Sequence, residues 1–297
     1  MPNNPILLGF ADYREQGRHI AKALSIEYHE VKTHYFPDGE VSVTLPASLP
    51  SRVIFCRSLN RPNDKLIELI LASNTARELG ASEITLIAPY LCYMRQDIAF
   101  HPGEAVSQKI IGQLLANLMD SIITVDPHLH RTASLDTVLP DTKTICLSAA
   151  SLIGEFIAQQ FKTAVIVGPD EESLQWVSCA AQSAGLPFAI AKKSRHGDRD
   201  VLVELPDFDL SGKNIILLDD IISSGHTIAQ AAGALKNAGA GKIHTIATHA
   251  LFNEQTQKLL SESGVETVWS TDSVANPTNA ISLAELIANG LINHEIC

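Results

Sequence analysis

The sequence predicts an α/β protein whose sheets are mainly parallel and flanked by helices. Two observations lead to this fold class. Short apolar runs rich in valine and isoleucine recur along the chain, and segments with helical periodicity lie between them. Strands and helices that alternate in this way form parallel sheets with helices on both faces. The 297 residues, of which 45% are hydrophobic and 19% charged, are enough for two compact domains.

The apolar runs predict seven strands, with helices between them. Residues 64–80 have the clearest helical pattern, and Gly80 is placed to cap the carboxyl end of this helix. The apolar stripe of the helix consists of Leu66, Leu69, Ile70, Ala76 and Leu79. The predicted strands cover residues 6–10, 52–57, 83–88, 121–126, 164–168, 214–219 and 242–247.

A weak internal repeat divides the chain. Residues 80–88 read GASEITLIA and residues 239–247 read GAGKIHTIA, with identical residues at the glycine, both alanines and two isoleucines. Two interpretations are open, because junctions between a helix, a glycine and a strand look alike in many proteins. The other interpretation is a duplicated domain with a join near 140–150. We therefore divide the chain into predicted domains at 1–145 and 146–297.

The composition disfavours several classes of function. A net charge of −11 at pH 7 does not suit the broad basic surface that nucleic acid needs, so phosphate groups would be bound locally. The five cysteines are scattered, which predicts no disulfides and favours the cytoplasm. No run approaches the roughly 20 apolar residues of a membrane span, and we expect neither a signal peptide nor membrane binding.

The most informative stretch is NIILLDDIISSGHTIAQAAGAL, residues 214–235. An apolar strand ends there in Asp219 and Asp220, whose carboxylates can accept hydrogen bonds from the vicinal hydroxyls of a sugar. The hydroxyls and N–H groups of the following turn can hold a phosphate at the positive end of the next helix. The alternative is an acidic strand end with an ordinary serine helix cap. This predicted phosphate loop consists of Ser223, Ser224, Gly225, His226 and Thr227.

Three shorter polar segments also suggest chemistry. The Pro-Asp-Gly sequence within residues 36–40 is a strong β-turn signal. Arg95 follows a predicted strand and suits a phosphate or a stacked adenine, with a surface ion pair as the alternative. Lys193 and Arg195 lie in a polar segment whose charges suit a lid over phosphates, with a solvated basic turn as the alternative.

Taken in order through nearly the whole chain, these motifs resemble ribose-phosphate pyrophosphokinases, and the FHPGEA sequence is most similar to the short, archaeal-type members. The phosphate loop by itself resembles that of the wider phosphoribosyltransferase superfamily. The resemblance implies two phosphoribosyltransferase-like domains. It also implies transfer of the β,γ-diphosphoryl group of ATP to the C1 hydroxyl of ribose 5-phosphate, with AMP as the other product. The motifs are FPDGEVSV (36–43), PYLCYMRQD (89–97), FHPGEAVSQK (100–109), VDPHLH (125–130), VGPDEES (167–173), KKSRHGDRDV (192–201) and the loop within 214–235.

The resemblance also implies roles for individual residues. Lys193 and Arg195 match the family's catalytic lysine and its arginine partner. His128 and Asp170 match its residues linked to Mg²⁺, and His130 is the alternative to His128. The implied ATP-binding residues, in the first domain, are Phe36, Asp38, Gly39, Glu40, Arg95, Gln96 and Asp97. The implied ribose 5-phosphate-binding residues, in the second, are Asp219, Asp220, Ser223, Ser224, Gly225, His226 and Thr227.

Two residues of the phosphate loop depart from the family pattern. Larger bacterial and animal members usually have an acid where Ser223 stands, and a small residue is usual where His226 stands. The resemblance further implies a homo-oligomer, a dimer or a multiple of dimers, because the turn at 36–40 reaches the ATP site of a neighbouring subunit in that family. Two alternatives are a catalytically silent regulatory homologue and a phosphoribosyltransferase that consumes the activated sugar. The intact Lys193 and the ATP-like motifs argue against them.

Overall fold

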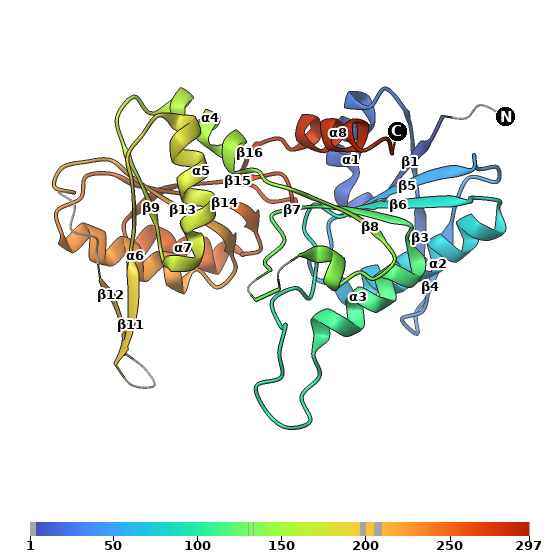
Figure 1. Ribbon diagram of the computed structural model, residues 1–297, viewed down its shortest axis with the longest axis horizontal. Coiled ribbons are helices and arrows are strands. Elements are labelled where there is room, and N and C mark those ends of the chain that lie inside the picture. Colours follow the sequence, from blue (N-terminus) through green and yellow to red (C-terminus); the bar gives the residue numbers. More distant parts are fainter. Residues whose placement is uncertain (1–3, 130, 133, 197–199, 205–209, 297) are drawn as a thin grey trace. The chain divides into compact units, whose positions relative to one another are not determined.

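The computed structural model describes residues 4–129, 131–132, 134–196, 200–204 and 210–296, and for 192–196 and 200–204 it describes the backbone only. Two α/β units make up the chain (Figure 1). The first unit comprises the residues up to Leu147 and those from Leu283 onward, and the second comprises Ser148–Ser282. Each unit contains a six-stranded parallel sheet, which confirms the predicted fold class. No helix in the described ranges is long and apolar enough to cross a membrane.

The first sheet has the strand order β2-β1-β5-β6-β7-β8. Its inner strands are buried almost throughout, as expected for a sheet covered on both faces. In Figure 1, α1 and α8 lie on one face and α2 and α3 on the other. The strands are β1 (Ile6–Gly9), β2 (Glu27–Glu30), β5 (Arg52–Cys56), β6 (Glu83–Ile87), β7 (Ser121–Val125), β8 (Lys143–Leu147) and the antiparallel hairpin β3 (Lys32–Tyr35) with β4 (Val41–Thr44). The helices are η1 (Ala11–Tyr13), α1 (Arg14–Ala23), α2 (Pro62–Glu78), α3 (Ser107–Leu118), η2 (Leu135–Thr137) and α8 (Ala284–Asn293).

The second sheet has the strand order β10-β9-β13-β14-β15-β16. Helices α4 and α5 lie on one of its faces, and α6 and α7 lie on the other (Figure 1). The strands are β9 (Val165–Gly168), β10 (Phe188–Ile190), β13 (Ile215–Ile222), β14 (Ile243–Ala250), β15 (Val265–Thr271), β16 (Asn279–Ile281) and the antiparallel hairpin β11 (Lys192–His196) with β12 (Asp200–Glu204). The helices are α4 (Ala150–Gln160), η3 (Glu171–Ser173), α5 (Leu174–Ala184), α6 (His226–Asn237) and α7 (Glu254–Glu262).

The two units repeat one topology. In each sheet the second strand in chain order lies outside the first, and the later strands follow in order on the other side. Each unit also has its antiparallel hairpin between its second and third sheet strands. The repeated segments 80–88 and 239–247 both lead into the fourth strand, β6 or β14. The sequence repeat therefore coincides with a topological repeat, which favours duplication over a chance likeness.

The same helix cap begins both repeated segments. The Gly80 N–H donates to the Arg77 carbonyl at 3.0 Å, and the next N–H, of Ala81, reaches back to Ala76 at 3.0 Å. The corresponding bonds from Gly239 and Ala240, to Lys236 and Leu235, are also 3.0 Å long. This pattern needs a residue with positive φ after the helix, and Gly80 (φ 99°) and Gly239 (φ 82°) provide it. The predicted Gly80 cap is confirmed.

Two features differ from the sequence expectations. Residues 283–296, which we assigned to the second domain, pack in the first unit, because α8 lies against α1 and β8. Gly290 allows this contact, since a Cβ there would lie 2.9 Å from the Leu147 side chain. In α2, Leu66, Leu69 and Ala76 are buried, but Leu79 is 37% exposed because it is the last turn's capping residue.

Candidate functional site

Most candidate residues lie at the carboxyl ends of parallel strands, where ligands bind in open α/β sheets. In the first unit, the segment with Arg95 follows β6 and the segment with His128 follows β7. In the second unit, Asp170 follows β9, and Asp219 and Asp220 lie near the end of the adjacent strand β13. Each unit therefore presents these polar groups at one edge of its own sheet.

The predicted phosphate loop connects β13 to α6. Asp220 is 3% exposed and Asp219 is half-buried, and the Asp220 N–H donates to Asp219 Oδ1 at 3.0 Å. Gly225 is the residue before α6 and has no side chain with which to cap this helix end. The loop therefore leads directly to the amino end of α6, where the helix dipole favours an anion. His226, the first residue of α6, is exposed, so its imidazole does not fill the turn.

Gly225 is required for two local reasons. Its φ of 76° lies in the left-handed region, which favours glycine. A Cβ at this position would also lie 2.5 Å from the Thr256 methyl group of α7. The same threonine hydroxyl donates to the Ser223 carbonyl at 3.4 Å. Helix α7 therefore supports the loop from the protein side and leaves its other side for a ligand.

In the first unit, the RQD segment is fixed by an internal network. The Gln96 side chain donates to Glu104 Oε1 at 2.8 Å and accepts from the Ser107 hydroxyl at 2.6 Å. Glu104 Oε2 accepts from the backbone N–H groups of Phe100 and His101, at 2.7 and 2.9 Å. Glu104 belongs to the FHPGEA motif, which sequence reasoning gave no role. In the structure, the Glu104 carboxylate accepts the hydrogen bonds that fix the conformation of this loop.

Arg95 and Asp97 differ sharply in their surroundings. Arg95 is exposed and makes no hydrogen bond or ion pair within the described residues, so its guanidinium is available to a ligand. The Asp97 side chain is 3% exposed and binds Arg131, through Nη1 at 3.0 Å and the backbone N–H at 3.2 Å. Asp97 therefore ties the RQD segment to the segment that contains His128. Nothing in the sequence had marked Arg131.

The FPDGE residues form the tip of the β3–β4 hairpin, as the turn signal predicted. The Phe36 N–H donates to the Glu40 carbonyl at 2.8 Å, and the Glu40 N–H donates to Asp38 Oδ1 at 3.1 Å. Gly39 has a φ of 92°, which the turn requires. Phe36 is 44% exposed, and its ring meets His34 edge to face at 4.9 Å. The turn thus presents an aromatic ring outward.

Lys193 and Arg195 lie on β11 of the second hairpin. Their backbones pair with Val203 and Val201 of β12. Their side chains, and residues 197–199 at the tip, lie outside the described residues, as does His130. The predicted polar lid segment is therefore built on two antiparallel strands.

The donor set for a metal is small. Among the described residues, no group of three or more His, Cys, Asp or Glu side chains converges in a metal-binding geometry. His128 and Asp170 are both partly exposed beyond strand ends. His128 belongs to the first unit and Asp170 to the second. Neither side chain alone could hold Mg²⁺ unless substrate oxygens and water completed the coordination, since this ion prefers oxygen and retains water.

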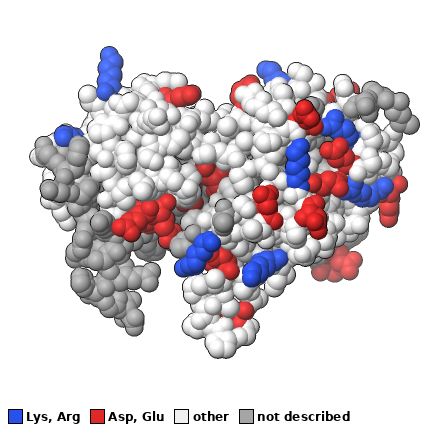
Figure 2. Space-filling model, in the orientation of Figure 1, with Lys and Arg blue, Asp and Glu red and all other residues white. Residues whose placement is uncertain are grey.

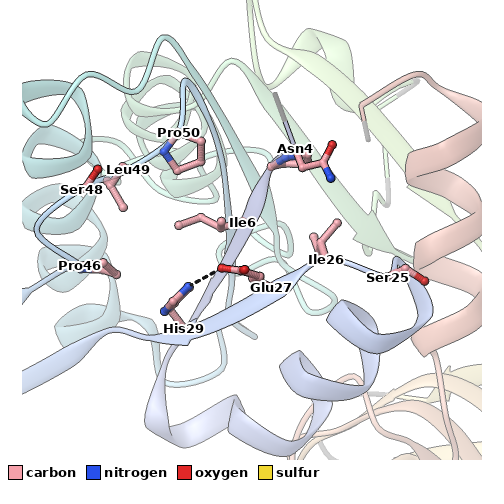
Figure 3. A pocket seen from close by; sticks show the side chains of 11 residues that line it. Asn4, Ile6, Ser25, Ile26, Glu27, His29, Pro46, Ser48, Leu49 and Pro50 are labelled. Atoms are coloured by element: carbon pink, nitrogen blue, oxygen red, sulfur yellow. Dashed lines mark hydrogen bonds and ion pairs between the residues drawn. The ribbon is translucent and has the colours of Figure 1, made fainter. Parts of the chain in front are cut away.

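Two cavities lie away from these edges. One, of about 560 Å³, is near the amino ends of β1 and β2, and its lining includes Ile6, Glu27 and His29 (Figure 3). His29 Nε2 lies 3.3 Å from Glu27 Oε2. The other, of about 480 Å³, is near the amino ends of β9 and β13. Their position at the amino ends of strands separates both cavities from the candidate site.

Comparison with known proteins agrees with this arrangement. The model of the N-terminal domain of ribose phosphate pyrophosphokinase matches residues 6–118, and that of the phosphoribosyl transferase domain matches 139–279. A ribose-phosphate pyrophosphokinase of Methanopyrus kandleri is 34% identical over 97% of this chain and 99% of its own length. That of Thermoplasma acidophilum is 32% identical over 95% and 97%. The crystal structure of phosphoribosylpyrophosphate synthetase from Mycobacterium smegmatis matches with a TM-score of 0.83 and 26% identity, covering 98% of this chain and 99% of that one.

Proposed function

The chain belongs to the ribose-phosphate pyrophosphokinase family, and we propose that it transfers the diphosphoryl group of ATP to the C1 hydroxyl of ribose 5-phosphate. The products are 5-phosphoribosyl 1-diphosphate and AMP. The observation that carries this proposal is the carboxyl end of β13, where two aspartates precede a glycine turn and the amino end of α6. This arrangement suits a sugar phosphate, and the exposed Arg95 of the other unit suits a nucleotide phosphate.

The phosphate loop holds the sugar substrate in this mechanism. The 5-phosphate accepts hydrogen bonds from the hydroxyls of residues 223–227 and from the N–H groups at the start of α6. Asp219 and Asp220 accept hydrogen bonds from the ribose hydroxyls, with Asp219 the more accessible of the two. The C1 hydroxyl then attacks the β-phosphorus of ATP and AMP leaves. Positioning and dispersed positive charge lower this barrier, without a covalent enzyme intermediate.

The first unit provides the nucleotide side of the reaction. Arg95 contacts ATP phosphate, and the turn at 36–40 holds adenine by stacking on Phe36 and by a hydrogen bond to Asp38. Gln96 and Asp97 act within the protein, because their polar atoms bind Glu104, Ser107 and Arg131. Their contribution to ATP binding is to fix the segment that carries Arg95.

Magnesium is the proposed cofactor. His128 and Asp170 would hold it together with ATP oxygens, and the bound ion would neutralise charge on the diphosphoryl group. Lys193 and Arg195, on the β11–β12 hairpin, supply the remaining positive charge at the reacting phosphorus.

The site is proposed to be completed by assembly. Exposed apolar side chains occur on α2, on α3 and on the first hairpin: Ile67 (52%), Leu71 (38%), Ile110 (59%) and Phe36 (44%). Such a surface favours a homo-oligomer in which first units meet, as a dimer or a multiple of dimers. The free thiols of Cys56, Cys92, Cys146 and Cys179 support the cytoplasm as the compartment.

The charge distribution supports small anionic substrates. On the face shown in Figure 2, lysine and arginine side chains lie among acidic ones, and the described residues form no continuous basic surface there. With a net charge of −11, binding of nucleic acid is not expected. Phosphate recognition is then confined to the strand-end edges.

A single assay tests the proposed reaction. Purified protein with ATP, ribose 5-phosphate and Mg²⁺ should form AMP and 5-phosphoribosyl 1-diphosphate in equal amounts, with no ADP. Nucleotides are separated by chromatography, and the sugar product is measured with a coupled transferase. ADP as the nucleotide product would mean transfer of a single phosphoryl group and would contradict the proposal. Complete absence of turnover would favour a regulatory homologue.

Replacing Asp219 or Asp220 with asparagine should weaken ribose 5-phosphate binding by roughly 10–100-fold, because each change weakens charge-assisted hydrogen bonds to the ribose. Calorimetry with ribose 5-phosphate measures the effect without turnover. Asp141→Asn is the matched control, since it removes the same charge from an exposed position whose φ of 58° asparagine tolerates. Unchanged affinity in both site variants would remove the carboxylates from the sugar site.

A further inference from the structure

A chain of polar and charged side chains connects the first hairpin, at the 53% exposed Tyr35, to two buried charged groups in the core of its unit. We call it the hairpin anchor, and it consists of Tyr35, Glu68, Arg57, Asp12 and Lys65. Glu68 is 1% exposed and Arg57 is 5% exposed, although charged side chains are seldom buried unless they are paired. Both lie within the core of the first unit, one on α2 and the other directly after β5.

Each charge in the anchor is compensated by the next. Tyr35 donates its hydroxyl proton to Glu68 Oε1, and Arg57 Nη1 donates to the other carboxylate oxygen. Arg57 Nε donates to Asp12 Oδ1 at 3.1 Å, and Lys65 Nζ contacts Asp12 Oδ2 at 2.6 Å. The hydrogen bond to Glu68 raises the pKa of Tyr35 to about 12. A phenol is protonated at neutral pH even without this shift, so Tyr35 is the donor and the carboxylate the acceptor.

Further contacts hold the inner end of the anchor. Lys65 Nζ donates to the Ser58 carbonyl and to Asn60 Oδ1, each at 2.7 Å. The Arg57 guanidinium lies 4.2 Å from the centroid of the Phe10 ring, a cation–π contact. Arg57 therefore binds Oε2 of Glu68, and Oε1 accepts the hydrogen bond from Tyr35.

The duplicated topology explains where this anchor lies. In the second unit, the loop after the third sheet strand is the phosphate loop before α6. In the first unit, the corresponding loop, residues 57–61, joins β5 to α2. Arg57 of this loop pairs with Asp12 and Glu68, and Lys65 in the first turn of α2 also pairs with Asp12. Protein carboxylates therefore lie beside this loop, whereas its counterpart is suited to a phosphate. The first-unit loop therefore serves to hold structure.

What the anchor holds is the hairpin with the FPDGE tip. Tyr35 is the last residue of β3, pairs with Val41 of β4, and directly precedes Phe36. Its hydroxyl links the base of the turn to the α2 carboxylate. The hydrogen bonds within the turn, from Phe36 to Glu40 and from Gly39 to Phe36, fix the conformation of the turn. They do not fix the orientation of the hairpin relative to the rest of the first unit.

We propose that Tyr35 and Glu68 are positioning residues that hold the turn at 36–40 in the orientation in which it binds the adenine of ATP. This inference rests on the proposed function of the turn. In this inference Glu68 acts only through Tyr35. It affects the affinity for ATP without contacting the nucleotide.

Tyr35→Phe tests the inference, because it removes one hydroxyl and keeps the ring. KM for ATP should rise about tenfold, as expected when a hydrogen bond to a charged group is lost. The value of kcat at saturating ATP and KM for ribose 5-phosphate should stay within about twofold of wild type. Tyr28→Phe is the matched control, since the Tyr28 hydroxyl is buried without a hydrogen-bond partner among the described residues. It should leave both KM values unchanged.

Hydrogen exchange provides a readout that does not depend on turnover. In Tyr35→Phe, amides of the hairpin segment 32–44 should exchange faster, while those of β1 and β5 keep their wild-type protection. Glu68→Gln, which keeps an acceptor for Tyr35 but weakens the pairing with Arg57, should fall between wild type and Tyr35→Phe in both measurements. Unchanged exchange in segment 32–44 of Tyr35→Phe would overturn the anchor's positioning role.

Phe36→Ala separates this inference from the function on which it rests. If Phe36→Ala raises KM for ATP and Tyr35→Phe does not, the turn binds ATP and the anchor does not position it, so the inference is overturned alone. If Phe36→Ala leaves KM for ATP unchanged, the proposed adenine contact is wrong and the inference falls with it. A rise in both variants, with faster exchange in Tyr35→Phe, supports the two together.

Discussion

Replacing Lys193 with alanine should lower the rate of 5-phosphoribosyl 1-diphosphate formation by about 10²–10³-fold, the usual effect of removing one group that stabilises charge in a transition state. The affinity for ribose 5-phosphate should remain, because the phosphate loop and Asp219 lie on β13 and α6 rather than on the β11–β12 hairpin. Steady-state kinetics gives the rate, and calorimetry gives the affinity of the sugar.

Lys192→Ala is the matched control for this prediction. It removes the same charge from the adjacent position of β11, so general electrostatic and folding effects should be equal in the two variants. Arg195→Ala, two residues further along the same strand, should reduce the rate in the same direction. A Lys193→Ala enzyme with wild-type turnover, or equal losses in Lys192→Ala and Lys193→Ala, would return this segment to the interpretation of a solvated basic turn.

The strands that sequence patterns predicted are those at the centre of the sheets. Strands such as β7 are buried on both faces and therefore appear as continuous apolar runs. Edge strands lack this signal: β2 reads EYHE and is mostly half-exposed, and β8, at the other edge, lies within the stretch interpreted as a domain join. Helix α8 belongs to the first unit because it packs against α1 and β8. A local sequence pattern cannot predict such a long-range contact.

The candidate site likewise has features that the local sequence predicts and features that only tertiary contacts create. The phosphate loop could be found because its acids, its turn and its helix are consecutive in the chain, so local chemistry suffices. The partners of Gln96 and Asp97 could not be found from spacing, because Glu104 and Arg131 are reached only when loops fold together. The hairpin anchor was hidden for the same reason. Glu68 falls on the buried side of α2, where a helical pattern alone predicts an apolar residue.

Mixing two inactive variants should restore activity if the FPDGE turn completes the ATP site of a neighbouring subunit. We expect Phe36→Ala/Asp38→Ala chains and Lys193→Ala chains each to be nearly inactive. In a hybrid dimer, one site receives its turn from the Lys193→Ala chain and its lysine from the other chain. Random re-association makes half of the symmetric dimers hybrids with one complete site each, so activity should recover to about one quarter of wild type.

Two comparisons make this result interpretable. Phe36→Ala/Asp38→Ala/Lys193→Ala chains mixed with Lys193→Ala chains contain no intact lysine and should show no recovery, which excludes activation by mixing itself. Dilution of the wild-type enzyme below the dissociation constant of the dimer should lower its specific activity, because ATP binding is then linked to association. If hybrids form, as shown by native mass spectrometry, and activity does not return, the turn serves its own subunit or lies outside the site.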